Sequence, residues 1–377
     1  MHIKKQIFNH LKNLPGWRTK RKLVVISVDD YGNVRLDSKK ARENMDKAGL
    51  KVHSRFDAYD TLETRDDLGA LFEVLTSVKD KKGNHAVFTP FALPCNINFE
   101  AMQEEGYERY IYELLPETYA KLSALQPQAY KGTWDLWKEG IEKGLMAPQF
   151  HGREHFNLKV FESNLNLGDK STLVALKNRS YTSINNSLHP RLSYTGAFDL
   201  EDLLGLKGYH AIVKDGTRRF NEVYGYYPDY FNPPGAREHS DLHEALHDCG
   251  IKYMDAPLIK KQIKEGGGYS YDMSYLGKKN KLGQRFLIRN VVFEPGFTGV
   301  ETAVSIAWKQ INAAFRLNKP AIISSHRVNF SGLITESNRT ESLKALKILI
   351  EMITANYPEV EFISALELAK IITKDGR

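Results

Sequence analysis

Histidine and carboxylate side chains occur in this sequence directly after short apolar runs. His151 and His155 are four residues apart and follow the run 145–150. At that spacing a helical turn or a tight loop places both imidazole rings on one side, where they suit a divalent cation. A catalytic metal site of this kind also needs a carboxylate ligand and an open position for water.

The adjacent carboxylates Asp29 and Asp30 follow another apolar run, 23–28. Two neighbouring carboxylates repel each other unless a cation or a proton relieves the repulsion. One of them can bind a metal ion while the other acts as a base toward water. The alternative is a helix N-cap followed by an acidic first turn, which accounts for one aspartate more easily than for two.

Two further polar residues stand at the ends of strand-like runs. His326 follows 321–325 and is a candidate third metal ligand or general acid, with a packing role as the alternative. Asp255 follows 251–254 and could orient His326, with a loop-starting aspartate as the alternative. By contrast, His239, His243 and His247 recur every four residues on a predicted helix, away from its apolar stripe, and are expected to face solvent.

Strand-like runs alternate with helical patterns along the chain. Strands are predicted at 23–28, 85–89, 145–150, 230–231, 251–254, 286–293, 321–324 and 360–363, and helices at 37–48, 66–79, 200–220, 241–249, 301–316, 341–354 and after 363. This alternation predicts parallel βαβ units, and seven or eight of them favour a distorted (β/α)7–8 barrel of the α/β class. The polar clusters would then converge on the rim that holds the carboxyl ends of the strands.

We expect one barrel domain over 23–377, preceded by a basic segment, 1–22. The stretch of about 95–145 has helical patches and no strand-like run, so it is predicted to be a helical insertion over the carboxyl-terminal rim. Its tyrosines and tryptophans are expected to pack the insertion for the most part, with one or two lining the cleft.

The composition excludes several classes of protein. The 377 residues are 42% hydrophobic and 26% charged, which is typical of a globular chain rather than a disordered or coiled-coil one. No run approaches the apolar length of a membrane span. Two cysteines are too few for a disulfide framework, which favours a reducing compartment.

The net charge of +7 lies in the basic segment 1–22, which has seven lysines and arginines and no acidic residue. The remainder is neutral, so no nucleic-acid partner is expected. The segment lacks the features of a signal peptide, and we expect a cytoplasmic protein. Apolar residues interleaved with the cations would allow peripheral contact with an anionic membrane at its inner face. Deletion of 1–20 should then leave hydrolysis intact; the alternative is a segment folded back with Leu14 and Trp17 buried.

The order of these motifs resembles that of the NodB-type polysaccharide deacetylases. The resemblance rests on S-V-D-D-Y-G at 27–32, H-x-x-x-H at 151–155, N-P-P-G at 232–235, Asp255, and I-S-S-H at 323–326. The Asp-Asp-Tyr-Gly form is also similar to the YdjC-like deacetylases, but the wider histidine spacing favours the NodB-type family.

The resemblance implies a role for each matching residue. Asp30, His151 and His155 would hold a divalent metal, most simply zinc, while Asp29 would be the general base. His326 would be the general acid, oriented by Asp255.

The third motif implies the substrate contacts. The backbone near Gly235 would help to bind the oxyanion. Asn232 stands where the family has an arginine that tethers the base, and Arg237 or Arg153 are the candidates to replace that arginine.

The implied function is metal-dependent hydrolysis of an N- or O-linked acetyl group on a carbohydrate or glycan precursor. The alternatives are an amidase acting on a small metabolite that is not a sugar, and a catalytically inactive carbohydrate-binding protein. The substrate, the metal and the oligomeric state are not predicted by the sequence.

Overall fold

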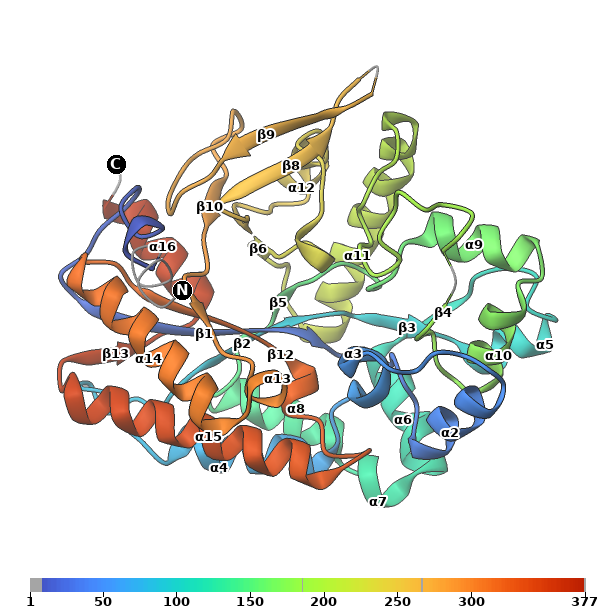
Figure 1. Ribbon diagram of the computed structural model, residues 1–377, viewed down its shortest axis with the longest axis horizontal. Helices are drawn as coiled ribbons and strands as arrows, with labels where there is room; N and C mark the ends of the chain where they lie inside the picture. The colour runs from blue at the N-terminus through green and yellow to red at the C-terminus, as the bar shows by residue number, and fades with distance from the viewer. Residues whose placement is uncertain (1–8, 185, 266, 376–377) are drawn as a thin grey trace.

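The computed structural model describes residues 9–184, 186–265 and 267–375, and its centre is one nine-stranded sheet (Figure 1). The strands lie in the order β10 (Arg285–Leu287), β7 (Tyr253–Asp255), β6 (Tyr230–Phe231), β5 (Gln149–Phe150), β2 (Phe88–Ala92), β1 (Lys22–Tyr31), β12 (Ala321–His326) and β11 (Val291–Val292). The ninth strand, β13 (Val360–Phe362), pairs with the start of β1. Each of these pairings is parallel.

The sheet curls into an incomplete barrel, which confirms the predicted α/β class and distorted-barrel architecture. Within the described residues no strand pairing joins β10 to β11, the two ends of the order. The barrel therefore has a seam between these strands. Parallel pairing places the carboxyl ends of all its strands on one rim.

Helices cover the outside of the sheet. The long helices α14 (Val300–Arg316), α15 (Glu336–Asn356), α4 (Arg65–Thr76) and α8 (Thr133–Glu142) pack side by side, and α11 (Leu206–Tyr224) packs on α12 (Leu242–Asp248). Figure 1 shows α14, α15 and α4 along one side of β1. The apolar face of α14 is typical: Ala303, Ala307 and Ile311 are buried at helical spacing against the sheet.

Smaller helices occupy the loops. They are α2 (Lys39–Lys47), α3 (Arg55–Tyr59), α5 (Phe99–Glu104), α6 (Leu115–Leu125), α7 (Pro127–Tyr130), α9 (Leu158–Asn166), α10 (Lys170–Lys177), α13 (Pro295–Thr298) and α16 (Ala365–Asp375), with 3₁₀ turns η1 (Leu203–Gly205), η2 (Pro234–Ala236) and η3 (Arg327–Asn329).

The insertion is helical, but the prediction that it contains no strand was wrong. An antiparallel pair, β3 (Cys95–Ile97) and β4 (Tyr112–Leu114), begins it. Each strand has only three residues, too few for a periodic pattern to show in the sequence. The aromatic residues pack as expected: Trp137 is fully buried and its indole N–H donates to Glu63 and to the hydroxyl of Tyr119, each at 3.0 Å.

A second hairpin explains why the prediction was wrong for His239, which precedes α12, and for His243, which lies on it. Only His247 is exposed; His239 and His243 are buried. The antiparallel strands β8 (Ile259–Ile263) and β9 (Tyr269–Met273) project from the barrel over α12 (Figure 1). Helical periodicity reports the faces of one helix and does not show that a following hairpin covers them.

The described part of the basic segment, 9–22, folds back onto the barrel. The side chain of Trp17 packs against a buried apolar cluster that includes Leu23 of β1 and Ile372 of α16. Its backbone N–H donates to the carbonyl of Leu276 at 2.8 Å. The ammonium of Lys319 donates to the carbonyls of Pro15, Gly16 and Trp17, each at 2.7 Å. Figure 1 shows this segment beside α16. Leu14, expected to be buried in that arrangement, is 47% exposed.

Membrane contact by the segment 1–22 stays a prediction, since residues 1–8 lie outside the described residues. No helix in the described part of the chain combines the length and the apolar character needed to cross a bilayer.

Candidate active site

A cavity of about 640 Å³ opens at the rim of the barrel. Seven of the residues singled out in the sequence line it: Asp29, Asp30, His151, His155, Asn232, Asp255 and His326. They come from the ends of β1, β5, β6, β7 and β12 and from the loops that follow. Gly235, in η2, also lines the cavity.

An irregularity in β1 turns both neighbouring aspartates toward this cavity. In a regular strand successive side chains point to opposite faces of the sheet. Asp30 has a φ of 75°, in the left-handed region, and the pairing of β1 with β2 shifts register between Val28 and Tyr31. This break in the alternation lets Asp29 and Asp30 serve the same site. Such strain in a residue other than glycine is typical of functional positions.

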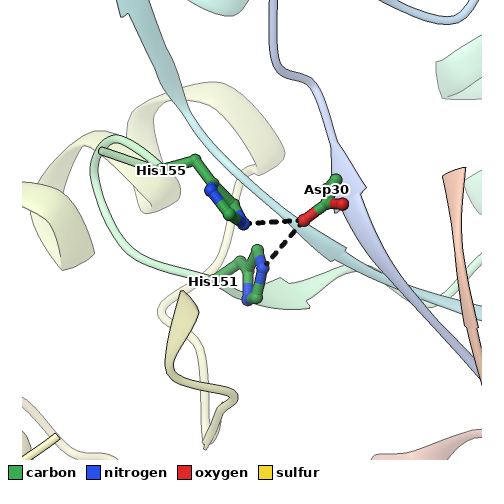
Figure 2. Close-up of side chains that lie close together, drawn as sticks. All are labelled: Asp30, His151 and His155. Carbon is green, nitrogen blue, oxygen red and sulfur yellow. Dashed lines mark ion pairs between the residues drawn. The ribbon is translucent and has the colours of Figure 1, made fainter. Parts of the chain in front are cut away.

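Asp30, His151 and His155 form a compact buried group (Figure 2). The Nε2 atom of His155 lies 2.7 Å from Oδ1 of Asp30, and Nε2 of His151 lies 3.4 Å from the same oxygen. One ligand atom from each residue lies within 4.8 Å of the other two. Histidine, cysteine and carboxylate side chains are the usual metal ligands of proteins, and within the described residues they come close enough to share an ion at this group.

The protonation of the two imidazoles fits a cation at this group. Nδ1 of His151 lies 2.7 Å from the carbonyl oxygen of Asn232, so Nδ1 carries the proton and Nε2 presents a lone pair. That Nε2 atom is buried and has no hydrogen-bond partner among the described residues. Burial lowers the pKa of His155, which favours its neutral form despite the charge of Asp30. Two imidazole nitrogens and one carboxylate oxygen suit zinc or a similar divalent ion.

Asp29 is held by two neighbours. Arg289 donates to both of its carboxylate oxygens, at 2.7 and 2.9 Å, and the Asn232 amide donates to Oδ1 at 2.8 Å. Burial alone would raise the pKa of Asp29, but the charge and the hydrogen bonds of Arg289 outweigh it and lower that pKa. Asp29 is therefore an ionised carboxylate with a fixed orientation.

Asp255 lies in the cavity wall but does not contact His326 as expected. It accepts hydrogen bonds from the hydroxyl of Tyr230 at 2.7 Å and from Nε of Arg289 at 2.9 Å. Arg289 therefore bridges Asp29 and Asp255. Through Arg289, Asp255 is therefore linked to Asp29 rather than to His326.

Glu294 makes the contact with His326 that was expected of Asp255. Its Oε1 lies 2.7 Å from Nδ1 of His326, and its other oxygen accepts from Asn329 at 2.5 Å. Burial would lower the pKa of His326, but the hydrogen bond and charge of Glu294, with Asp30 and Asp29, raise it to about 9. His326 is thus protonated at neutral pH, and its Nε2 lies 3.9 Å from Asp29.

Neither arginine proposed to tether the base does so. Arg153 pairs with Glu154 and Asp215, and Arg237 pairs with Asp199. Arg289 occupies that role, from the loop between β10 and β11. The run 286–293 was predicted to be one strand, but it is two strands, β10 and β11, and Arg289 lies in the loop between them.

The insertion 95–145 and the turn at Gly235 were both expected to contribute to this site. No residue of 95–145 lines the cavity among those described, so the prediction that one or two aromatic residues of the insertion do so was wrong. Near Gly235 the backbone N–H of Ala236 already donates to Pro233 at 2.9 Å. An oxyanion role for this turn stays a prediction.

No family model matches the chain, and no curated protein matches its sequence. Solved structures that are similar to it include a Mycobacterium smegmatis protein proposed to be a polysaccharide deacetylase, at 13% identity, TM-score 0.47, and coverage of 96% of this chain and 94% of that one. The α-amylase AmyC from Thermotoga maritima is 11% identical, with a TM-score of 0.49 and coverage of 93% and 74%.

Peptidoglycan deacetylase PdaC from Bacillus subtilis is a third similar structure, at 11% identity, TM-score 0.38, and coverage of 94% of this chain and 93% of that one. Polysaccharide and peptidoglycan deacetylases are thus among the structural neighbours of this chain. The fold and site define an α/β protein with an incomplete parallel barrel and a buried Asp–His–His group on its rim.

Proposed function

We propose that this chain is a metal-dependent hydrolase that removes an N- or O-linked acetyl group from a carbohydrate or glycan precursor. One observation carries the proposal. A buried Asp–His–His group lines the same cavity as an ionised carboxylate, Asp29, and a protonated imidazole, His326. Hydrolysis of an acyl bond needs this combination of a base, an acid and a group that polarises the acyl oxygen.

Asp30, His151 and His155 would hold the cation through one carboxylate oxygen and two imidazole nitrogens. A bound divalent ion supplies Lewis acidity, which polarises a carbonyl and lowers the pKa of water. The chain's own contribution here is orientation: the backbone carbonyl of Asn232 fixes the ring of His151. Partners of this kind hold the tautomer and the angle of a metal ligand.

Asp29 would accept the proton of the attacking water. Its bidentate contact with Arg289 and its contact with Asn232 hold the carboxylate in place. Asn232 therefore contributes part of the tether that the related family draws from arginine, and Arg289 contributes the positive charge. Arg289 also keeps the base ionised, so Asp29 is ready to act at neutral pH.

His326 would donate a proton to the leaving amine or alkoxide. An acid is useful only while it is protonated, and Glu294 keeps this imidazole in that form. Phe56 packs edge-on against the His326 ring at 5.2 Å between centroids and limits its rotation.

The test combines metal analysis with acetate release. Purified protein should bind one divalent ion per chain, and the loaded protein should release acetate from at least one member of a panel of N- and O-acetylated sugars. Asp29→Asn should keep the metal and lose turnover, while His247→Gln, on the exposed part of α12, is the matched control. Metal binding without acetate release from sugars, but with release from small amides, would favour the amidase instead.

A further inference from the structure

One lysine of the basic segment lies at the wall of the cavity. Lys12 lines the same cavity as Asp29, His326 and Arg289, although it comes from the opposite end of the chain from His326. It is half-buried, and burial lowers the pKa of its ammonium to about 8, so the group is still largely charged at neutral pH.

The position of Lys12 is fixed by its neighbour. Asn13 is 3% exposed, and its side-chain oxygen accepts a hydrogen bond from Asn290 at 2.8 Å. Asn290 in turn accepts from the backbone of Ile322 in β12 at 2.8 Å and lines the cavity itself. With Lys319 holding the carbonyls of 15–17, the segment is part of the cavity wall rather than a frayed end.

Lys12 is the charged group of this cavity that has no opposite charge beside it. The other charged side chains that line it are paired: Arg289 with Asp29 and Asp255, and Arg35 with Asp57 at 3.0 Å. The acidic Asp30 contacts the two histidines of the metal group, and His326 is paired with Glu294. Among the described residues Lys12 has no hydrogen-bond or ion-pair partner for its ammonium.

A half-buried ammonium loses part of its hydration and gains nothing in return unless a ligand supplies an anion. We propose that Lys12 recognises an oxyanion, a carboxylate or a phosphate, carried by the acetylated sugar that this site accepts. The inference rests on the proposed deacetylase function for the identity of the sugar, but the anion contact itself depends only on Lys12 and the cavity. Lys12 is then a specificity-determining residue.

The test measures binding separately from hydrolysis. Calorimetry compares three sugars that differ in one group: glucosamine, glucosamine 6-phosphate, and glucosamine with a 3-O-lactyl carboxylate. The proteins are wild type, Lys12→Gln, Lys12→Arg, and Lys20→Gln as a control that removes the same charge from an exposed position in the same segment. Melting temperatures check that the variants are folded.

We expect wild type, Lys12→Arg and Lys20→Gln to bind at least one anionic sugar roughly 10- to 100-fold more tightly than glucosamine, the range of a charge-assisted hydrogen bond. Lys12→Gln should lose that preference. Comparison of the affinities for the 6-phosphate and for the 3-O-lactyl carboxylate shows which oxyanion fits the cavity. Equal binding of glucosamine and its two oxyanion-bearing forms by wild type, or an undiminished preference in Lys12→Gln, would overturn the inference.

Acetate release from the N-acetylated forms of the same sugars separates the two proposals. A preference for the anion that depends on Lys12, without any acetate release by the metal-loaded enzyme, would reject the deacetylase proposal and leave the anion site standing. Acetate release that is equally fast for neutral and anionic sugars, and insensitive to Lys12→Gln, would reject the anion site and leave the deacetylase proposal standing.

Discussion

Replacing Glu294 by glutamine should change the pH dependence of the enzyme rather than its maximal activity. Glu294 is the main group that raises the pKa of His326 from 6.5 to about 9. A hydrogen bond to a charged partner contributes about 1.5–3 kcal/mol, and one pKa unit corresponds to about 1.36 kcal/mol. Glu294→Gln should therefore lower the pKa of His326 by roughly 1 to 2 units.

The sign follows from the role of the group. A general acid works in its protonated form, so activity falls as the pH rises through its pKa. The alkaline limb of kcat/KM should move from near pH 9 in the wild type toward roughly pH 7–8 in Glu294→Gln, with similar rates near pH 6. A bound cation lowers the pKa of His326 in both proteins, so the difference between the two limbs is the quantity to measure.

The assay is acetate release from pH 5 to 11 at saturating metal. Glu301→Gln, an exposed glutamate in the first turn of α14, removes the same charge without touching His326 and should leave the profile unchanged. An alkaline limb that stays in place in Glu294→Gln would refute the assignment of His326 as the acid that Glu294 maintains. A uniform loss of rate at every pH would instead indicate damage to the site.

Five other substitutions test the remaining groups. Asp29→Asn should keep the bound metal, measured by elemental analysis, and lower kcat by about 10²- to 10⁴-fold, as removal of a general base does. His326→Ala should also keep the metal; its loss would make His326 a ligand. His151→Gln should lose the metal. Arg289→Met leaves two buried carboxylates without their cation, so urea denaturation should show a loss of about 3–5 kcal/mol. His243→Gln should keep the metal but lower the melting temperature, since His243 is buried against Glu238 at 3.0 Å.

The barrel class and the residues of the metal group were predictable from the sequence because both depend on local patterns. Apolar runs mark the strands, and parallel strands bring their carboxyl ends to one rim whatever the loops between them do. His151 follows such a run directly, Asp30 follows one after Asp29, and His155 follows four residues after His151. Their positions are therefore fixed by the strand that precedes them.

Residues that act through long-range contacts were not predictable in this way. Arg289 and Glu294 lie in an irregular stretch around β11, a strand of two residues whose limits no periodic pattern reveals. Asp255 was given a role by analogy of position, but the direction of its side chain depends on Tyr230 and Arg289. The burial of His243 depends on the β8–β9 hairpin, whose position over α12 is a tertiary contact that helical periodicity does not report.

The seam of the barrel has a consequence for how the chain tolerates shortening. Residues 13–19 contact both of its sides: Leu276 before β10, Asn290 before β11, and Asn318 before β12, whose carbonyl accepts from the Thr19 N–H at 2.7 Å. Strands at the ends of a sheet present unpaired backbone groups that a second molecule can join. A protein that starts at β1 would lose the segment that contacts both sides of the seam, so we expect it to self-associate. Deletion of 1–20, harmless when judged from charge alone, would then make the seam accessible to a second molecule.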